Sequence, residues 1–171
     1  MPLVGTNNII QKQVLNANNL VTTNPGSSFQ ELNSAFRLSI TPKFSNSLIF
    51  LEYFIPLNQS TSGHNNIFGF SGYRYAPSEA NLDSRGQSSG SRKRFAGGNI
   101  RAQNGYDHND HNLEYFIAYD SPATTSTCTY GFQVYQEGSD SGTIYIAHSQ
   151  GNNSTWGMSS RVIITASEIK Q

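Results

Sequence analysis

The stretch Ser47-Leu-Ile-Phe-Leu-Glu-Tyr-Phe-Ile-Pro-Leu57 is the densest apolar run in the chain and constrains the fold more than any other feature. It is too short for a membrane-spanning helix, which needs about 20 residues, and its β-branched and aromatic content predicts a buried strand. Alternation places Ile49, Leu51, Tyr53 and Ile55 on one face and Leu48, Phe50, Glu52 and Phe54 on the other. Both faces are mostly apolar, whereas a strand in a lone two-layer domain usually keeps one polar face. We therefore expect the second face to contact more of this chain or another copy of it.

Strand-like segments follow one another through most of the chain. No window of useful length carries apolar residues at helical spacing, whereas short alternating or apolar runs recur between clusters of Gly, Asn, Ser and Pro. Eight segments are predicted to be strands: Ile9–Asn16, Ala35–Thr41, Leu48–Leu57, Asn66–Ala76, Leu113–Tyr119, Thr127–Glu137, Thr143–His148 and Arg161–Ile169. Two shorter strands are expected near Asn19–Thr22 and Arg92–Ala96. This pattern predicts an all-β, antiparallel two-sheet sandwich, with the jelly roll as the expected version.

Alternation within these strands predicts the core. The expected core residues are Phe36, Leu38, Ile40, Leu113, Tyr115, Ile117, Tyr130, Phe132, Val134, Ile144, Ile146, Val162 and Ile164. The turn-rich stretch Glu137–Gly142 joins two strong strands, which predicts a hairpin between Thr127–Glu137 and Thr143–His148. The region 77–112 shows little periodicity and is expected to be mainly a long loop.

Length, charge and composition narrow the class of protein. The chain has 171 residues, which favours one domain over residues 1–171, with residues 1–8 as an extended N-terminal arm. The net charge is zero, which argues against a general nucleic-acid binder. Charged residues make up only 13% of the chain, against about 25% in typical soluble domains, and Asn and Ser take their place. The N-terminus lacks the features of a secretory signal, and no apolar segment is long enough to span a membrane, so we expect synthesis in a cytoplasm without export and no membrane insertion.

One segment gathers residues that can ligate a metal ion. Tyr106-Asp-His-Asn-Asp-His-Asn112 offers two carboxylates, Asp107 and Asp110, and two imidazoles, His108 and His111. Their spacing matches neither a zinc signature nor a calcium-binding loop. The favoured interpretation is a solvated loop before a strand. The four residues remain weak candidates for a metal held between copies on a symmetry axis, and no cofactor is expected.

The remaining reactive side chains form no catalytic pattern. Cys128 is the only cysteine, so an intrachain disulfide is impossible, and it is expected to be a small buried core residue. The chain lacks phosphate-binding, dinucleotide-binding, nucleophile-elbow and zinc-protease motifs, which predicts that it is not an enzyme. Trp156 precedes the last strand, where it can plug one end of a sandwich or stack on a sugar. Together with Tyr106, it is the candidate contact for a ligand or receptor.

Several stretches resemble a recurring pattern in virion proteins of tailed phages, especially marine and cyanobacterial phages. They are Asn8-Ile-Ile-Gln-Lys-Gln-Val-Leu15, Phe36-Arg-Leu-Ser-Ile-Thr-Pro-Lys-Phe-Ser-Asn-Ser-Leu-Ile-Phe50, Thr129-Tyr-Gly-Phe-Gln-Val-Tyr135, Gly142-Thr-Ile-Tyr-Ile146 and Ser159-Ser-Arg-Val-Ile-Ile-Thr-Ala-Ser-Glu-Ile169. In that pattern, a strand ending in Ser-Ile-Thr-Pro is followed by a Ser-rich turn and an apolar strand. Such proteins are similar to the jelly rolls of tumour necrosis factor and complement C1q, which form compact trimers. The resemblance implies a homotrimer located in the virion.

The resemblance also implies a role. It suggests a structural module of a tail fibre, a tail appendage or a capsid decoration, held by other capsid or tail proteins and able to contact the host surface. The alternative is a carbohydrate-binding module that recognises a host-surface glycan. The residues expected at the subunit interface are Leu48, Phe50, Glu52 and Phe54. Because an unpaired buried carboxylate is costly, Glu52 would need a partner, and Arg37 or Arg161 is expected to supply it.

Overall fold

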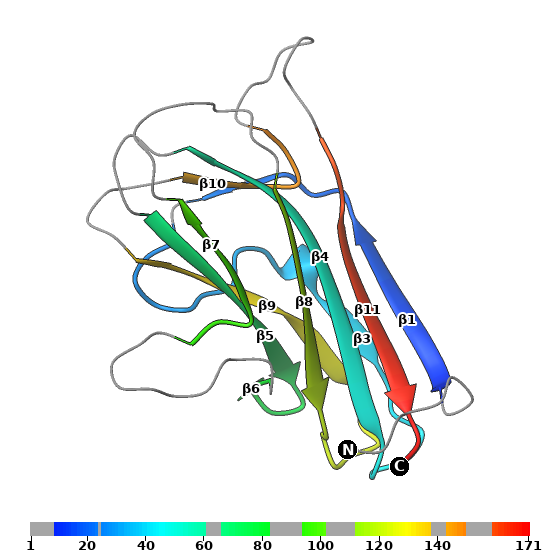
Figure 1. Cartoon of the computed structure of the whole chain (residues 1–171). Helices are drawn as coiled ribbons and strands as arrows, with labels where there is room; N and C mark the ends of the chain where they lie inside the picture. Colours follow the sequence, from blue (N-terminus) through cyan, green and yellow to red (C-terminus); the bar gives the residue numbers. More distant parts are fainter. Residues whose placement is uncertain are drawn as a thin grey trace.

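Two antiparallel β-sheets lie face to face in the computed structural model and enclose the hydrophobic core (Figure 1). The structure describes residues 9–23, 25–60, 66–82, 94–101, 112–137, 143–149 and 159–171. Sheet A contains β1 (Ile9–Ala17), β2 (Val21–Thr23), β4 (Leu48–Ser60), β8 (Asn112–Asp120), β10 (Thr143–Ile146) and β11 (Val162–Ile169). Sheet B contains β3 (Leu38–Ile40), β5 (Asn66–Ala76), β6 (Ala80–Asn81), β7 (Gly97–Arg101) and β9 (Cys128–Glu137). A short 3-10 helix, η2 (Ser34–Phe36), precedes β3.

The order of the strands is that of a jelly roll. Sheet A runs β1-β11-β4-β8 along most of its length, and sheet B runs β3-β9-β5-β7. Counting these eight main strands in chain order, the first pairs with the eighth, the second with the seventh, the third with the sixth and the fourth with the fifth. This nested antiparallel pairing is produced when one long hairpin of strands rolls up into two sheets. The predicted all-β, two-sheet sandwich of jelly-roll type is therefore confirmed.

The inward faces of the two sheets form one continuous core. Ile49, Leu51, Tyr53 and Ile55 of β4 are fully buried, as alternation predicted. From η2 and the other strands, the predicted residues Phe36, Leu38, Ile40, Tyr130, Phe132, Val134, Ile144, Ile146, Val162 and Ile164 are buried as well. Cys128 is a free thiol in this core, and burial raises its pKa, so it is an unreactive packing residue as expected.

The predicted hairpin between Thr127–Glu137 and Thr143–His148 is wrong. β9 lies in sheet B between β3 and β5, whereas β10 lies in sheet A between β2 and β4. The connection after Glu137 therefore crosses from one sheet to the other. Turn residues between two apolar strands predict that the chain changes direction. They do not show whether the next strand pairs with the first or belongs to the opposite sheet.

The predicted core face of β8 is also wrong. Leu113, Tyr115 and Ile117 point out of the sandwich and are 59%, 50% and 37% exposed, whereas Phe116 and Ala118 point inward and are buried. The outward residues of this strand are more apolar than its inward ones, which include Asn112, Glu114 and Asp120, so alternation alone pointed to the wrong face.

Three further segments differ from expectation. The region 77–112 contains two strands, β6 and β7, so it is not only a loop. The strand expected at Arg92–Ala96 lies further along the chain, at Gly97–Arg101, and the described residues 94–96 precede it. The segment expected to be a strand at Ala35–Thr41 begins with η2, because the Asn33 side chain accepts a hydrogen bond from the Ala35 backbone N–H (2.8 Å) and caps a helical turn.

Among the described residues, no helix is long and apolar enough to cross a membrane.

Candidate functional site

The outer surface of sheet A is the main candidate for an interaction site. Four strands, β8, β4, β11 and β1, run side by side there (Figure 1). Their register places outward side chains in rows, of which one contains Lys12, Ser167, Phe50 and Tyr119. The next rows contain Val14, Thr165, Glu52 and Ile117, and then Asn16, Ile163, Phe54 and Tyr115. Ile9, Ile169 and Leu48 lie at one end and Leu113 at the other. We call this set of side chains the A face.

The A face exposes an unusual concentration of apolar side chains. Of the eight large hydrophobic side chains that are exposed in the described part of the chain, six lie on it: Ile9, Val14, Leu113, Tyr115, Ile117 and Ile163. The four residues predicted to form a subunit interface, Leu48, Phe50, Glu52 and Phe54, belong to the same face and are partly buried. The structure therefore places these four residues on one surface, together with neighbours from β8, β11 and β1 that were not predicted as interface residues.

The two halves of the A face differ in the size of their side chains. On β4 and β8, Phe50 packs against Tyr119 with ring centroids 5.2 Å apart, and Phe54 packs against Tyr115 at 4.8 Å. These four rings form the aromatic half. On β1 and β11, the short side chains of Thr165 and Ser167 are buried beside Val14 and Ile163, which are exposed. This is the short-chain half.

Glu52 is hydrogen-bonded within its own sheet. Its carboxylate accepts a hydrogen bond from the Thr165 hydroxyl at 2.9 Å and a longer one from the Tyr115 hydroxyl at 3.4 Å. Within this chain neither Arg37 nor Arg161, the expected partners, pairs with it. Arg37 follows η2 and forms an ion pair with Glu31 (2.6 Å), and the Arg161 side chain lies before β11, where it lines a pocket. Partial burial and the Glu52 carboxylate raise the pKa of Tyr115.

The other predicted site residues lie outside the described residues. This applies to Tyr106, Asp107, His108, Asp110 and His111 and to Trp156. Within the ranges that the structure describes, no group of three or more His, Cys, Asp or Glu residues could hold a metal ion.

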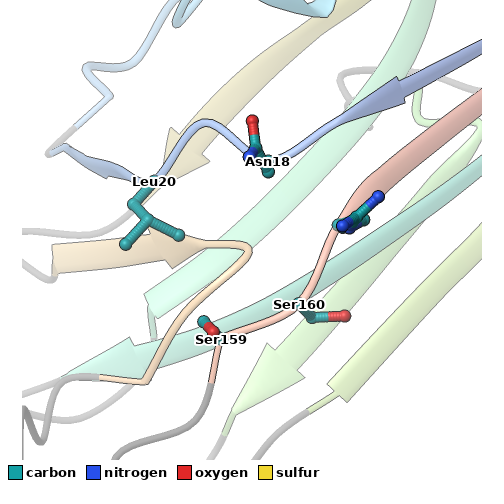
Figure 2. A pocket seen from close by; sticks show the side chains of 5 residues that line it. Asn18, Leu20, Ser159 and Ser160 are labelled. Carbon is teal, nitrogen blue, oxygen red and sulfur yellow. The ribbon is translucent and has the colours of Figure 1, made fainter.

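A pocket of about 310 Å³ opens elsewhere on sheet A and was not predicted. It is lined by Asn18, Leu20, Ser159, Ser160 and Arg161, and the first four of these are labelled in Figure 2. We call it the notch. Asn18 and Leu20 lie between β1 and β2, and the other three residues precede β11. The sequence carries one signal for it, Pro56, which lies in the middle of β4.

Comparisons with known proteins identify distant structural likenesses. No family model matches the chain, and no curated protein is similar to it in sequence. Among solved structures, the chain is similar to a chain in the structure of infectious bursal disease virus Gt strain, with 14% identity and a TM-score of 0.40 over 94% of this chain. A chain in the structure of the Gx strain gives 12% identity and a TM-score of 0.41 over 93% of this chain. This chain spans only 38% and 42% of the lengths of those two chains, and likenesses at this level do not establish a shared function.

Proposed function

We propose that this protein is a non-enzymatic structural component of a virion and that it assembles with copies of itself through the A face. The observation that carries the proposal is the apolar outer surface of sheet A. In this proposal, the jelly roll is a homotrimeric module of a tail fibre, a tail appendage or a capsid decoration. Other virion proteins hold it in place, and its exposed loops contact the host surface.

The size of the A face supports self-association. Four strands spaced by about 4.8 Å, followed over about eight residues at about 3.4 Å each, cover roughly 500 Å² before side-chain relief is counted. Exposed apolar patches on monomers rarely exceed a few hundred Å² unless they are functional. A standard protein–protein interface buries about 800 Å² per partner. Each half of the A face covers roughly 250 Å², so a contact between two halves supplies about a third of this area.

The differing halves of the A face support a contact between unlike surfaces. The bulky rings of the aromatic half complement the lower surface over Thr165 and Ser167 in the short-chain half. The charges are also distributed between the halves, because Lys12 lies in the short-chain half and Glu52 in the aromatic half. Packing the aromatic half of one copy on the short-chain half of the next brings opposite charges together, whereas packing like halves brings two Glu52 carboxylates together. A head-to-tail contact closes into a ring of three when successive copies are related by a rotation of 120°, which is the arrangement proposed for the trimer.

Mixing two variants tests the head-to-tail contact. Leu113→Glu disables the aromatic half, and Val14→Glu disables the short-chain half. Both side chains are more than half exposed, so the fold should tolerate the changes. Each variant alone should be monomeric. An equimolar mixture should form a one-to-one dimer, in which the unchanged aromatic half of Val14→Glu packs on the unchanged short-chain half of Leu113→Glu. A mixture that stays monomeric in native mass spectrometry would count against this arrangement.

Immunogold labelling of assembled particles tests the location. We expect the label on whole particles, at either the tail or the capsid, and the pattern distinguishes an appendage from a decoration. Particles that never carry the label, although the protein is present in the infected cell, would overturn the proposal of a virion component.

The second candidate function is a carbohydrate-binding module, and the notch is the observation that favours it. A concave site with a cation, hydroxyl groups and an amide offers the hydrogen-bonding groups that sugars need. The predicted contacts Trp156 and Tyr106 also belong to this alternative. A glycan-array signal that disappears with Trp156→Ala would support it, and an array without signal would count against it.

A further inference from the structure

The notch lies where two neighbouring strand positions of sheet A are interrupted at the same height along β4. At the outer position, β1 ends at Ala17 and β2 begins at Val21. At the position between these strands and β4, β10 ends at Ile146 and β11 begins at Val162. Their neighbour β4 is continuous and pairs with β11 up to Phe54 and with β10 from Leu57 onward. The chain therefore leaves and re-enters the sheet twice at one point.

Pro56 explains why the pairing changes partner there. Proline has no backbone N–H, so it cannot donate a hydrogen bond to a neighbouring strand. Its carbonyl oxygen accepts a hydrogen bond from the Ala147 N–H at 2.8 Å, and Ala147 adopts a positive φ of 64°, which turns the chain out of the sheet after β10. The Ala147 carbonyl in turn accepts a hydrogen bond from the Ser160 N–H at 2.7 Å. The wall of the notch is thus tied to the sheet by its backbone.

A second set of contacts holds the same wall. His148 forms a bridge with Ser159, and its ring lies against Tyr145 with centroids 5.3 Å apart. The His148 Nε2 atom also lies 3.1 Å from the Thr22 hydroxyl of β2. Backbone and side-chain contacts therefore connect the segments on both sides of the opening, and a ligand would meet a largely preformed site.

The residues that line the notch have the chemistry of an acidic-sugar site. Arg161 is exposed, and neither of the ion pairs formed among the described residues includes it. No acidic side chain lines the notch among the described residues, and the Arg161 guanidinium gives this lining a positive charge. Ser159, Ser160 and Asn18 add hydroxyl and amide groups, and Leu20, which is 56% exposed, offers an apolar surface.

We propose that the notch binds a carboxylated monosaccharide, such as a uronic or nonulosonic acid residue of a surface glycan. A guanidinium binds a carboxylate through two parallel hydrogen bonds. The hydroxyl groups and the amide then bind the hydroxyls of the sugar, and Leu20 packs against its apolar C–H face. A volume of about 310 Å³ accommodates a single sugar residue. This inference rests on the carbohydrate-binding alternative and is independent of assembly through the A face.

Titration of the full chain by isothermal calorimetry or ligand-observed NMR tests this inference. The probes are N-acetylneuraminic acid, glucuronic acid, the uncharged methyl ester of glucuronic acid, and acetate. We expect at least one of the acidic sugars to bind and both the ester and acetate to bind at least tenfold more weakly. Arg161→Ala should weaken binding of the acidic sugar at least tenfold. Arg161→Lys should weaken it less, because an ammonium keeps the charge but loses the paired geometry.

Lys170→Ala is the matched control, because it removes one positive charge at a site away from the notch. It should leave binding unchanged. Equal binding by the Arg161→Ala and Lys170→Ala proteins would overturn the inference, and so would equal binding of the ester and the acid. Acetate binding as tightly as the acidic sugars would show a simple anion site, or a site for acidic peptide side chains, and would overturn the assignment to a sugar. Sedimentation of the same samples keeps this result separate from assembly, since Arg161→Ala should have the oligomeric state of the wild type.

Discussion

Glu168 shows how much a single residue contributes to this fold. Its side chain is fully buried near the end of β11, yet its carboxylate is well satisfied. It accepts hydrogen bonds from the Ser47 hydroxyl (2.6 Å), the Gln11 amide (2.6 Å) and the backbone N–H groups of Lys43 (2.7 Å) and Phe44 (3.2 Å). These donors come from β1 and from the turn before β4, so one carboxylate ties three segments of the chain together.

Replacing this carboxylate should destabilise the protein. Glu168→Gln keeps the size of the side chain but removes the charge and places an N–H₂ group among donors. We expect a loss of about 2–3 kcal/mol in the free energy of unfolding, measured by urea denaturation at pH 7. Glu31→Gln is the control, because Glu31 forms a partly exposed ion pair with Arg37 and should cost at most about 1 kcal/mol. Equal effects of the two substitutions would show that the Glu168 hydrogen bonds contribute little.

Glu168 should also make the free energy of unfolding depend on pH. Burial alone would raise the pKa of Glu168, but the hydrogen bonds from Ser47, Gln11 and the two backbone amides outweigh it and hold the pKa below its usual value of 4.5. A carboxyl whose pKa is lowered by folding stabilises the protein above its unfolded-state pKa, and this contribution is lost as the pH falls through the folded-state pKa. The difference in unfolding free energy between wild type and Glu168→Gln should therefore be full at pH 7 and shrink below about pH 4. A difference that stays constant from pH 7 to pH 2.5 would contradict this assignment.

At the scale of elements, β4 is the strand around which sheet A is built. It pairs with β8 on one side and with β11 and then β10 on the other, and its inner residues are fully buried. Its existence and the separation of its faces were predictable, because a short apolar run rich in β-branched and aromatic residues is typical of a buried strand, whose successive side chains point to opposite faces. The continuation of β4 beyond Pro56 and its change of pairing partner could not be predicted, because both depend on where β10 and β11 pair with β4.

The errors at this scale share one physical cause. Alternation in β8 and the turn before β10 are local signals, whereas the inner face of a strand and its sheet are decided by distant partners. Leu113 and Tyr115 were expected inside and lie outside because Phe116 and Ala118 fit against the opposite sheet. Of the candidate sites, the A-face residues of β4 could be predicted from their two-sided apolar pattern. The notch could not, since it combines residues from two interruptions far apart in the sequence.

Close packing between the sheets gives a prediction for β5. A methyl group at Gly72 would lie 3.0 Å from Leu82 Cδ1, 3.2 Å from Ala118 Cβ and 3.2 Å from the Tyr53 hydroxyl oxygen. Gly72→Ala should therefore lower the free energy of unfolding by about 1–3 kcal/mol through overpacking. Gly26→Ala is the control, because no atom lies within 4 Å of the added methyl group, and it should be close to neutral. Thermal unfolding of both variants provides the comparison, and a neutral Gly72→Ala would show that the sheets can separate at little cost.

At the scale of the whole molecule, the two sheets differ in their outer surfaces. The outer surface of sheet B carries polar pairs such as Ser39 with Thr129, and its Tyr135 is covered by Phe29 and Phe95 of the same chain, whereas that of sheet A carries the exposed A face. A two-sheet sandwich needs only one apolar face on each sheet. The second apolar face of sheet A therefore has no role in the fold of one chain, and this asymmetry is the reason for proposing an assembly of copies.

Sedimentation velocity of the wild type and of matched charge variants tests this central claim most directly. Leu113→Glu and Val14→Glu each place a carboxylate on the A face, and Leu20→Glu is the control, because this leucine is equally exposed but lies outside the face. We predict that the wild type and Leu20→Glu sediment as trimers of about 56 kDa, three chains of 18.8 kDa, and that the two A-face variants sediment as folded monomers. A wild type that stays monomeric at tens of micromolar, or A-face variants that remain trimeric, would contradict the account.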